Sequence, residues 1–348
     1  MSSQAMINIK TLAPHYPHDF SKLSATQWIS LHMCLYRPLG DSPSFDPLFG
    51  PYISVLPRDF ASHPVVWMVK QDLRQTGLDT QLLEHLPPTT LAALKKICSK
   101  FWDDWGAVCN TSRHMSPVPI DFRAMATLPR GSKKKGQLAF VSPRETVEEG
   151  EEILLCYGAH ANRTLFVEYG FVNAIPDGAE DSDGYNGEVD VQDIVEELFA
   201  QKGPTGIWMK HVLEDNGYWG DWTLHASPQP AYPSFRLIAA LRLYHLALST
   251  ENSNLTDKVI DHWQDTLLGR RDVISDENEV AWRATLRDIC QAVGDRAGKS
   301  IDKLDGASED GSSAGWFVWM KRNIWTLWRE EQLVAAAVAA SVAGGKQF

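Results

Sequence analysis

Apolar residues recur at helical spacing through most of the chain. One stripe predicts a helix that starts after the capping-box sequence Ser24-Ala25-Thr26-Gln27 and ends at Arg37-Pro38. A second stripe follows two prolines and predicts a long helix over residues 90–108. Later stretches with the same spacing predict further helices at 191–200, 206–215, 235–248, 257–268, 278–293 and 316–342. The pattern therefore predicts a largely helical chain with an entirely helical second half.

Strand-like patterning appears in the middle of the chain. The stretch 137–142 predicts a β-element, and the apolar run 153–157, which follows a cluster of glutamates, predicts a strand. Residues 162–168 then predict a short helix. The polar, turn-rich stretch 175–185 is typical of a linker, and we expect the domain boundary there.

Three other segments interrupt the helical pattern. Residues 46–60 are rich in proline, glycine and aromatics and predict an irregular, packed connection. Residues 64–67 open an element whose type the local pattern leaves undecided. The segment 224–236 contains three prolines and predicts a break between helices.

Composition narrows the class of protein. The 348 residues are 44% hydrophobic and 22% charged, which is enough apolar material for two domains with substantial cores. The net charge of -11 argues against a nucleic-acid-binding surface, because such surfaces need clustered Lys and Arg. The short run Lys133-Lys134-Lys135 fits a solvated loop. Apolar runs stay below the roughly 20 residues that a membrane helix needs, so we expect no membrane contact.

The cysteines are scattered along the chain. None has the C-x-x-C spacing of a zinc site and their number is odd, so we expect no metal and no disulfide framework. That usage fits a reducing compartment, cytoplasmic or nuclear, and the N-terminal residues lack the apolar region of a signal peptide. Cys156 lacks a His–acid pair arranged in sequence to activate it, which favours an inert thiol. The five residues are Cys34, Cys98, Cys109, Cys156 and Cys290.

The stretch 148–172, EEGEEILLCYGAHANRTLFVEYGFV, holds two tyrosines twelve residues apart, each followed by glycine. Tyr157 ends the predicted strand, and Tyr169 follows the predicted short helix. This stretch resembles the C-terminal signature of SET-domain methyltransferases, above all the branch typified by the Rubisco large-subunit lysine methyltransferase (Rubisco LSMT). Weaker likeness to the same branch lies in residues 46–60, 222–243 and 274–290.

The resemblance implies an α+β fold, in which a partial SET-domain β-core with a helical insert is followed by an all-helical substrate-binding-like domain. Residues 1–180 then form the SET-like domain, with the insert at about 23–122 and the SET C-terminal core at about 137–173. Residues 181–348 form the helical domain, which holds the target protein.

The resemblance also implies a reaction, the transfer of a methyl group from S-adenosyl-L-methionine to a lysine side chain of a protein substrate. By position in the motif, Tyr157 matches the catalytic tyrosine, which aims the amine and lies beside the methyl donor. Tyr169 matches the tyrosine that lines the lysine channel, and Phe171 matches a residue beside the cofactor or the channel wall. Asn162 is expected to tie the loop between the tyrosines. A core role for Tyr169 and Phe171, and histidine as the methyl acceptor, stay open as alternatives.

Two parts of the family pattern are not found in this sequence. No Gly-x-Gly turn precedes residue 148, and Asp121-Phe122 is followed by RAMATLPRGSKKKG in place of a segment ending in Asn-His. That pair hydrogen-bonds the methyl donor, and each bond to a charged group contributes about 1.5–3 kcal/mol. Two interpretations therefore stay open. The chain is either an active SET-type protein-lysine N-methyltransferase or a catalytically inactive SET-family protein that acts as a protein-binding module.

Overall fold

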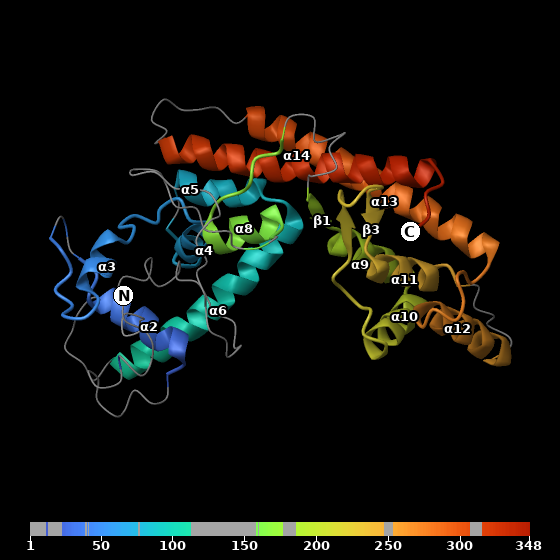
Figure 1. Ribbon diagram of the computed structural model, residues 1–348, viewed down its shortest axis with the longest axis horizontal. Helices are drawn as coiled ribbons and strands as arrows, with labels where there is room; N and C mark the ends of the chain where they lie inside the picture. Colours follow the sequence, from blue (N-terminus) through green and yellow to red (C-terminus); the bar gives the residue numbers. More distant parts are fainter. Residues whose placement is uncertain are drawn as a thin grey trace, which may run out of the picture. The chain divides into compact units, whose positions relative to one another are not determined.

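The computed structural model describes most of the chain, namely residues 12, 23–38, 40, 42–75, 77–112, 158, 160–176, 186–246, 253–306 and 315–348. The side chains of residues 78, 111–112 and 253–259 are not described. Helices make up most of the described residues, together with one three-stranded sheet (Figure 1), so the α+β class is confirmed. The predicted strand at 153–157 and the β-element at 137–142 lie outside the described residues.

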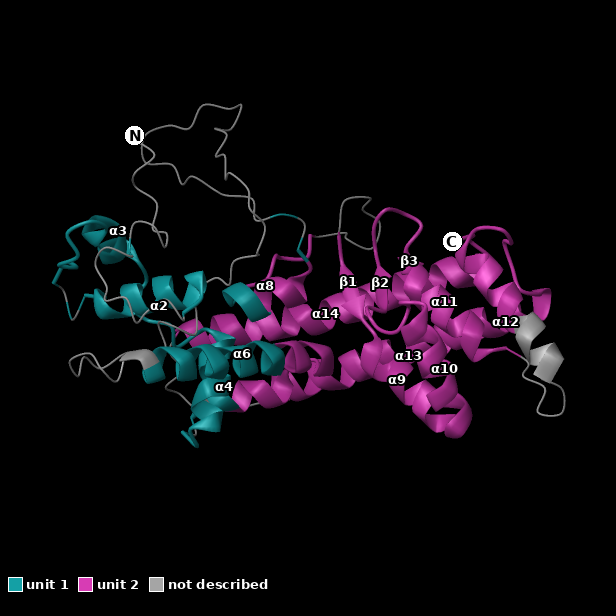
Figure 2. Cartoon of the chain, turned by 90° about the horizontal axis from the view of Figure 1, so that it is seen from below, with its two compact units in different colours: residues 1–80, 94–160, 167–170 teal, residues 81–93, 161–166, 171–348 magenta. Residues whose placement is uncertain are grey.

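The chain divides into two compact units (Figure 2). Unit 1 contains residues 1–80, 94–160 and 167–170, and unit 2 contains residues 81–93, 161–166 and 171–348. The division falls within three helices, α5 (Leu78–Gln81), α6 (Pro88–Ser112) and α8 (Asn162–Tyr169). The domain boundary expected near residue 180 stays a prediction.

In the part of the chain that the structure describes, the helices α2 to α5 and a 3-10 turn precede α6. The first, α2, begins with the predicted capping box, in which the Gln27 N–H donates to Ser24 Oγ at 3.3 Å and the Ser24 N–H donates to Gln27 Oε1 at 2.9 Å. These bonds satisfy N–H groups that the first helical turn leaves without partners, so the predicted start of the helix is confirmed. The elements are α2 (Ala25–Leu35), α3 (Gly50–Val55), α4 (Pro64–Asp72), α5 (Leu78–Gln81) and η3 (Leu82–His85).

The segment 46–60 contains the helix α3, so the prediction of an irregular connection is wrong in its centre. Asp46 starts this turn of chain, because its Oδ1 accepts the N–H groups of Leu48 at 2.7 Å and Phe49 at 2.9 Å. Such a local side-chain bond offers the backbone a turn that leads into a helix, although the segment is too short to show a helical period. The undecided element at 64–67 is the first turn of α4.

Unit 2 contains all six helices expected in the second half of the chain, and their existence is confirmed. The two longest, α13 and α14, lie side by side along most of their length (Figure 1). The helices are α9 (Gln192–Gln201), α10 (Pro204–Asp215), α11 (Phe235–Tyr244), α12 (Ser253–Leu267), α13 (Asp276–Gly306) and α14 (Gly315–Ala343).

Helix α13 continues well past the predicted end at residue 293. Gly294 and Gly298 interrupt the apolar pattern there, and glycine within a helix costs roughly 0.5–1 kcal/mol relative to alanine. The helix persists because Ala297 and Leu304 are buried, with 0% and 1% of their surface exposed. Packing against α14 therefore overrides the local preference.

A three-stranded antiparallel sheet lies in the half expected to be entirely helical, so that part of the prediction is wrong. Its strands β1 (Glu188–Asp190), β2 (Thr223–His225) and β3 (Tyr232–Pro233) lie in the order β1-β2-β3. Val189 pairs with Leu224, and Leu224 pairs with Pro233. Strands of two or three residues are too short to show an alternating pattern, and the prolines around β3 indicated only a break.

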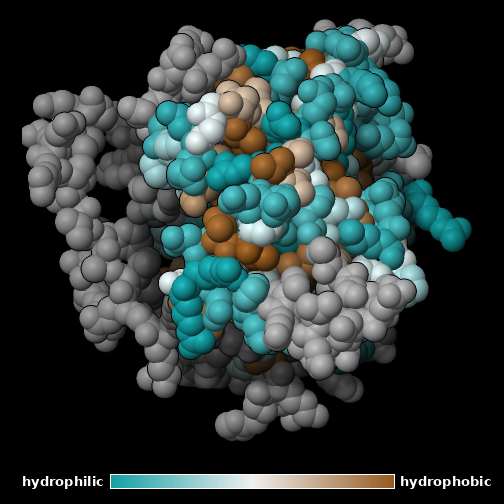
Figure 3. Space-filling view, turned by 90° about the vertical axis from the view of Figure 1, so that its right-hand side faces the viewer, coloured by the Kyte–Doolittle hydropathy of each residue, from teal (hydrophilic) through white to brown (hydrophobic). Residues whose placement is uncertain are grey.

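Large aromatic side chains fill the core of unit 2. Trp222 and Trp263 have no exposed surface, and the Phe199 and Trp222 rings stack with their centroids 6.0 Å apart. The Trp263 indole N–H donates to the Ala239 carbonyl oxygen at 2.9 Å, so this buried donor is satisfied. On the face seen in Figure 3, apolar residues lie in small groups between polar ones. Within the described residues, no helix combines the length and the apolar character that a membrane span requires.

Candidate functional site

The motif with the two Tyr-Gly pairs is described in part. Tyr157 and Cys156 lie outside the described residues. The description begins at Gly158 and, apart from residue 159, continues through α8 to residue 176. Tyr169 and Phe171 are both half-buried, Tyr169 in unit 1 and Phe171 in unit 2. Their roles in a lysine channel and at a cofactor stay predictions.

Both tyrosines of the motif are followed by a glycine with a positive φ angle. The angle is +107° at Gly158 and +80° at Gly170, a region that other L-residues rarely adopt. Space at Gly170 is also tight, because an added Cβ would lie 3.3 Å from His63 Cδ2, closer than most such contacts, and 3.5 Å from Pro64 Cδ, an ordinary contact. The backbone therefore requires glycine directly after Tyr169.

Asn162, at the start of α8, ties the two ends of the segment that carries Tyr169. Its Nδ2 donates to the Asn173 carbonyl oxygen at 3.3 Å, and its Oδ1 accepts the Asn173 N–H at 2.8 Å. The side chain is buried, so each end of the amide needs the partner that it has. Asn162 thus joins α8 to the segment that follows the second Tyr-Gly pair, whereas the sequence led us to expect a tie to the loop between the two tyrosines.

His63 contacts the other end of α8, a contact that local sequence patterns do not show. Its Nδ1 accepts the Val65 N–H at 3.3 Å, and its Nε2 lies 3.3 Å from the Glu168 carbonyl oxygen. Burial lowers the pKa of this imidazole to about 4, against a smaller opposing effect of the bond to Glu168. The ring is therefore neutral at physiological pH. The Ser24 capping box was visible in the sequence, whereas a histidine N-cap is not a usual start signal.

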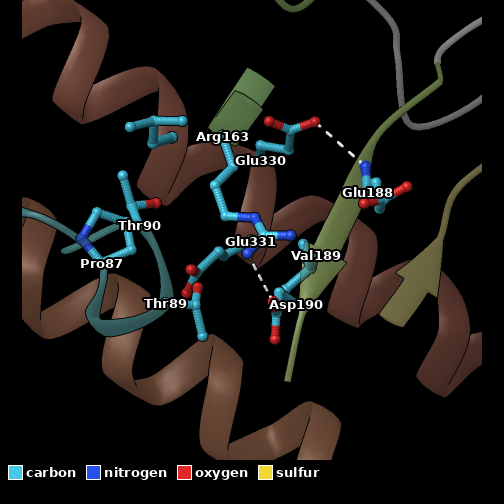
Figure 4. Close-up of a pocket in the computed structure, with 10 residues that line it drawn as sticks. Pro87, Thr89, Thr90, Arg163, Glu188, Val189, Asp190, Glu330 and Glu331 are labelled. Atoms are coloured by element: carbon cyan, nitrogen blue, oxygen red, sulfur yellow. Dashed lines mark hydrogen bonds and ion pairs between the residues drawn. The ribbon is translucent and has the colours of Figure 1, made fainter. Parts of the chain in front are cut away.

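A polar hollow in unit 2 lies beside the start of α8 (Figure 4). In it, Arg163 Nη1 and Asp190 Oδ2 form an ion pair at 2.7 Å, and the Glu188 N–H donates to Glu330 Oε1 at 3.3 Å. Arg163 follows directly on Asn162, so the same turn of α8 contacts both β1 and the segment at Asn173. The hollow is lined by Pro87, Thr89, Thr90, Arg163, Glu188, Val189, Asp190, Leu327, Glu330 and Glu331.

Burial dominates the electrostatics of this hollow. It raises the pKa of Asp190, although the Arg163 guanidinium beside that carboxyl acts in the opposite direction. Burial also raises the pKa of Glu331 from 4.5 to about 7, again against an opposing effect of a guanidinium, here that of Arg296. Arg296, on α13, bridges Glu331 on α14 and Asp193 on α9.

The hollow joins secondary-structure elements, and we assign no ligand to it. Its carboxylates have protein partners, Arg163 for Asp190, Arg296 for Glu331 and the Glu188 N–H for Glu330. Among the described residues, no three His, Cys, Asp or Glu side chains come together in a way that could hold a metal ion. The described residues also contain no hollow that we assign to the methyl donor, and both ends of the Asn162 amide are already engaged.

The comparisons with known proteins point to one group. Residues 208–334 match the family model described as Rubisco LSMT substrate-binding. The chain is 27% identical over 220 residues to the ribosomal lysine N-methyltransferase set11 of Schizosaccharomyces pombe, covering 55% of this chain and 51% of that protein. It is 28% identical over 195 residues to human SET domain-containing protein 4, covering 55% of this chain and 38% of that protein.

The mouse SET domain-containing protein 4 is 29% identical over 147 residues, covering 41% of this chain and 28% of that protein. The chain thus spans about half of the length, or less, of the curated relatives it matches. The matches confirm the resemblance to Rubisco LSMT-like SET proteins that the motif indicated, and they confirm a substrate-binding-like domain in the second half.

Proposed function

We propose, from the premise that this chain is a Rubisco LSMT-like SET protein, that it is an S-adenosyl-L-methionine-dependent protein-lysine N-methyltransferase. The cofactor of this family supplies an activated methyl group. The chain's own part is to bind the target protein, to strip water from the lysine amine and to aim that amine along one line. The cysteines are scattered and odd in number, and this pattern supports a cytoplasmic or nuclear location for the proposed enzyme.

The observation that carries the proposal is the backbone at the second Tyr-Gly pair. The positive φ angle and the close contact with His63 fix Gly170, and the Asn162 amide fixes the residues that follow. A side chain held by its neighbours on both sides is what a narrow channel for an alkylamine needs. In this proposal Tyr169 lines that channel, Tyr157 orients the amine beside the donor, and Phe171 packs against the cofactor or the channel wall.

The substrate in this proposal is a protein, recognised by the domain at 208–334 that matches the Rubisco LSMT substrate-binding model. The name of the fission-yeast relative points to ribosomal lysines as the first acceptors to test. The acidic net charge favours encounter with a basic surface, which ribosomal proteins offer, and this affects association rates more than identity.

The test incubates the purified chain with purified ribosomes and methyl-labelled S-adenosyl-L-methionine, and maps labelled residues by mass spectrometry. We expect methylated lysine, and we expect Tyr157→Phe to lower kcat by about 10²–10³-fold, the usual effect of removing one group that stabilises the transition state. Tyr52→Phe is the matched control, because it removes the same hydroxyl from a tyrosine that is 53% exposed on α3. Equal rates in the Tyr157→Phe variant and the control would refute the role of Tyr157.

A second candidate function is a protein-binding module without catalysis. The sequence favours it at one point, since RAMATLPRGSKKKG stands where the family has a segment ending in Asn-His. Isothermal titration with S-adenosyl-L-methionine separates the two functions. A Kd near 1 μM, or about −8 kcal/mol, supports the enzyme. Binding to ribosomes without binding of the methyl donor supports the module.

A further inference from the structure

The imidazole of His63 connects the start of α4 to the end of α8, although His63 and Glu168 are 105 positions apart in the sequence. His63 is the N-cap residue of α4, where Nδ1 accepts the Val65 N–H at 3.3 Å. On the other side of the ring, Nε2 lies 3.3 Å from the carbonyl oxygen of Glu168, the residue before Tyr169. All of these residues belong to unit 1.

The two contacts together fix the tautomer of the ring. A backbone N–H can only donate, so Nδ1 must present its lone pair to Val65. A carbonyl oxygen can only accept, so the proton must be on Nε2 and is donated to Glu168. This requires a neutral ring, and burial keeps it neutral because the pKa of His63 is lowered to about 4.

The same ring also contacts the residue after Tyr169. A Cβ at Gly170 would lie 3.3 Å from His63 Cδ2, which is closer than most side-chain contacts. The imidazole therefore holds the carbonyl group on one side of Tyr169 and packs against the glycine on the other side. Movement of the tyrosine backbone would break the bond, the packing or both.

We propose that His63 is a positioning residue for methyl transfer, which sets the orientation of Tyr169 through its hydrogen bond to Glu168 and its packing on Gly170. The proposal rests on the proposed function, because it assigns His63 a task within the lysine channel. His63 itself touches no reacting atom. Its effect is on the rate at saturating substrate rather than on donor binding.

Two substitutions separate the two bonds of the imidazole. In His63→Asn the amide oxygen takes the place of Nδ1, so it can still cap α4, but the side chain is too short to reach Glu168. In His63→Gln the amide nitrogen takes the place of Nε2 and can donate to Glu168, whereas the cap is lost. His63→Asn therefore keeps only the cap on α4, and His63→Gln keeps only the bond to Glu168.

We expect His63→Asn to lower kcat by roughly tenfold, since an equilibrium or rate factor of ten corresponds to 1.4 kcal/mol. KM for S-adenosyl-L-methionine should stay as in the wild type. Amide hydrogen exchange over residues 167–170 should become faster by a similar factor. His63→Gln should keep kcat within about twofold while Tm falls, because a lost N-cap destabilises α4. His245→Asn is the control. It makes the same substitution at the C-terminal end of α11, where the imidazole forms a hydrogen bond with the Thr285 hydroxyl.

Parallel loss of kcat and Tm in both variants would mean that His63 only stabilises the fold, and would overturn the proposal. An unchanged kcat with unchanged exchange in His63→Asn would overturn it as well. Hydrogen exchange separates this failure from failure of the proposed function, because it needs no activity. If the variants do not fold, nitrogen NMR of the wild-type imidazole decides. We expect the Nε2–H tautomer from pH 5 to 8, and the Nδ1–H tautomer or titration in that range would refute the proposal.

Discussion

Replacing Glu331 with glutamine should make the chain more stable at alkaline pH. Glu331 lies on α14 with only 6% of its surface exposed. Burial raises the pKa of its carboxyl to about 7, and the nearby carboxylates of Asp193 and Glu330 act in the same direction. Arg296 opposes them through its hydrogen bond and charge, but it is shared with Asp193. Ionised Glu331 is therefore less favourable in the folded chain than in the unfolded one.

The sign follows from which state holds the proton. In the unfolded chain Glu331 ionises near 4.5, whereas in the folded chain it keeps its proton up to about pH 7. The folded chain thus binds more protons between these values, so the free energy of unfolding falls as pH rises through this window. The difference between the two pKa values corresponds to about 3 kcal/mol of the free energy of unfolding, and this contribution is lost once the pH exceeds about 7.

Glutamine is close to the protonated acid in shape and has no charge to lose. Glu331→Gln should match the wild type near pH 4.5 and exceed its free energy of unfolding by about 3 kcal/mol at pH 8. Other carboxyl groups line the hollow or act on Glu331 in both proteins, namely Asp193, Glu330, Glu188 and Asp190, so only the difference between variant and wild type is informative.

Urea unfolding at pH 5 and pH 8, followed by tryptophan fluorescence, measures this difference. The matched control is Glu197→Gln, the same change on the exposed face of α9, which should give the same small difference at both pH values. A Glu331→Gln variant less stable than the wild type at pH 8 would refute the reasoning. It would mean that the bond to Arg296 outweighs the cost of burying the charge.

Three further substitutions test other contacts, each by urea unfolding. Gly170→Ala should cost about 1–2 kcal/mol, because alanine is strained at a positive φ angle and its Cβ would press on His63. Asp190→Asn should cost about 1.5–3 kcal/mol, because Arg163 loses its carboxylate partner, and a stability equal to the wild type would show that the pair is not formed. Trp263→Ala should cost about 3–5 kcal/mol, since it empties a fully buried site, and a cost below about 1 kcal/mol would contradict the core assignment.

Local signals in the sequence predicted the helices well. The start of α2 was visible because both partners of its capping box lie within one turn of chain. The helix α6 was also predicted correctly, because its long apolar stripe repeats at helical spacing and is visible in consecutive residues. The end of α13 was misplaced because two glycines break the pattern, and only packing against α14 holds the helix there.

Contacts between distant residues could not be predicted in this way. The strands β1 and β2 satisfy each other's backbone across more than thirty positions of sequence, and neither carries a pattern of its own. The bridge from Arg296 to Asp193 joins residues 103 positions apart. The sequence around each of these charged residues does not indicate which residue of another helix it will pair with. The motif at 148–172 predicted a site whose location stays a prediction, and nothing in it indicated that His63 would contact Glu168.

The proposed enzyme and the alternative binding module differ in what they require of the residues around Tyr169. A module that holds a target protein through 208–334 does not need a fixed tyrosine in the SET core, so loss of the Asn162 or His63 contacts would leave its target affinity unchanged. An enzyme loses rate when a channel side chain moves by even about 1 Å. Hydrogen bonds hold the backbone near both ends of α8, from Asn162 to Asn173 and from His63 to Glu168. If Tyr169 lines the lysine channel as proposed, these bonds restrict a residue whose placement the enzyme needs and the module does not.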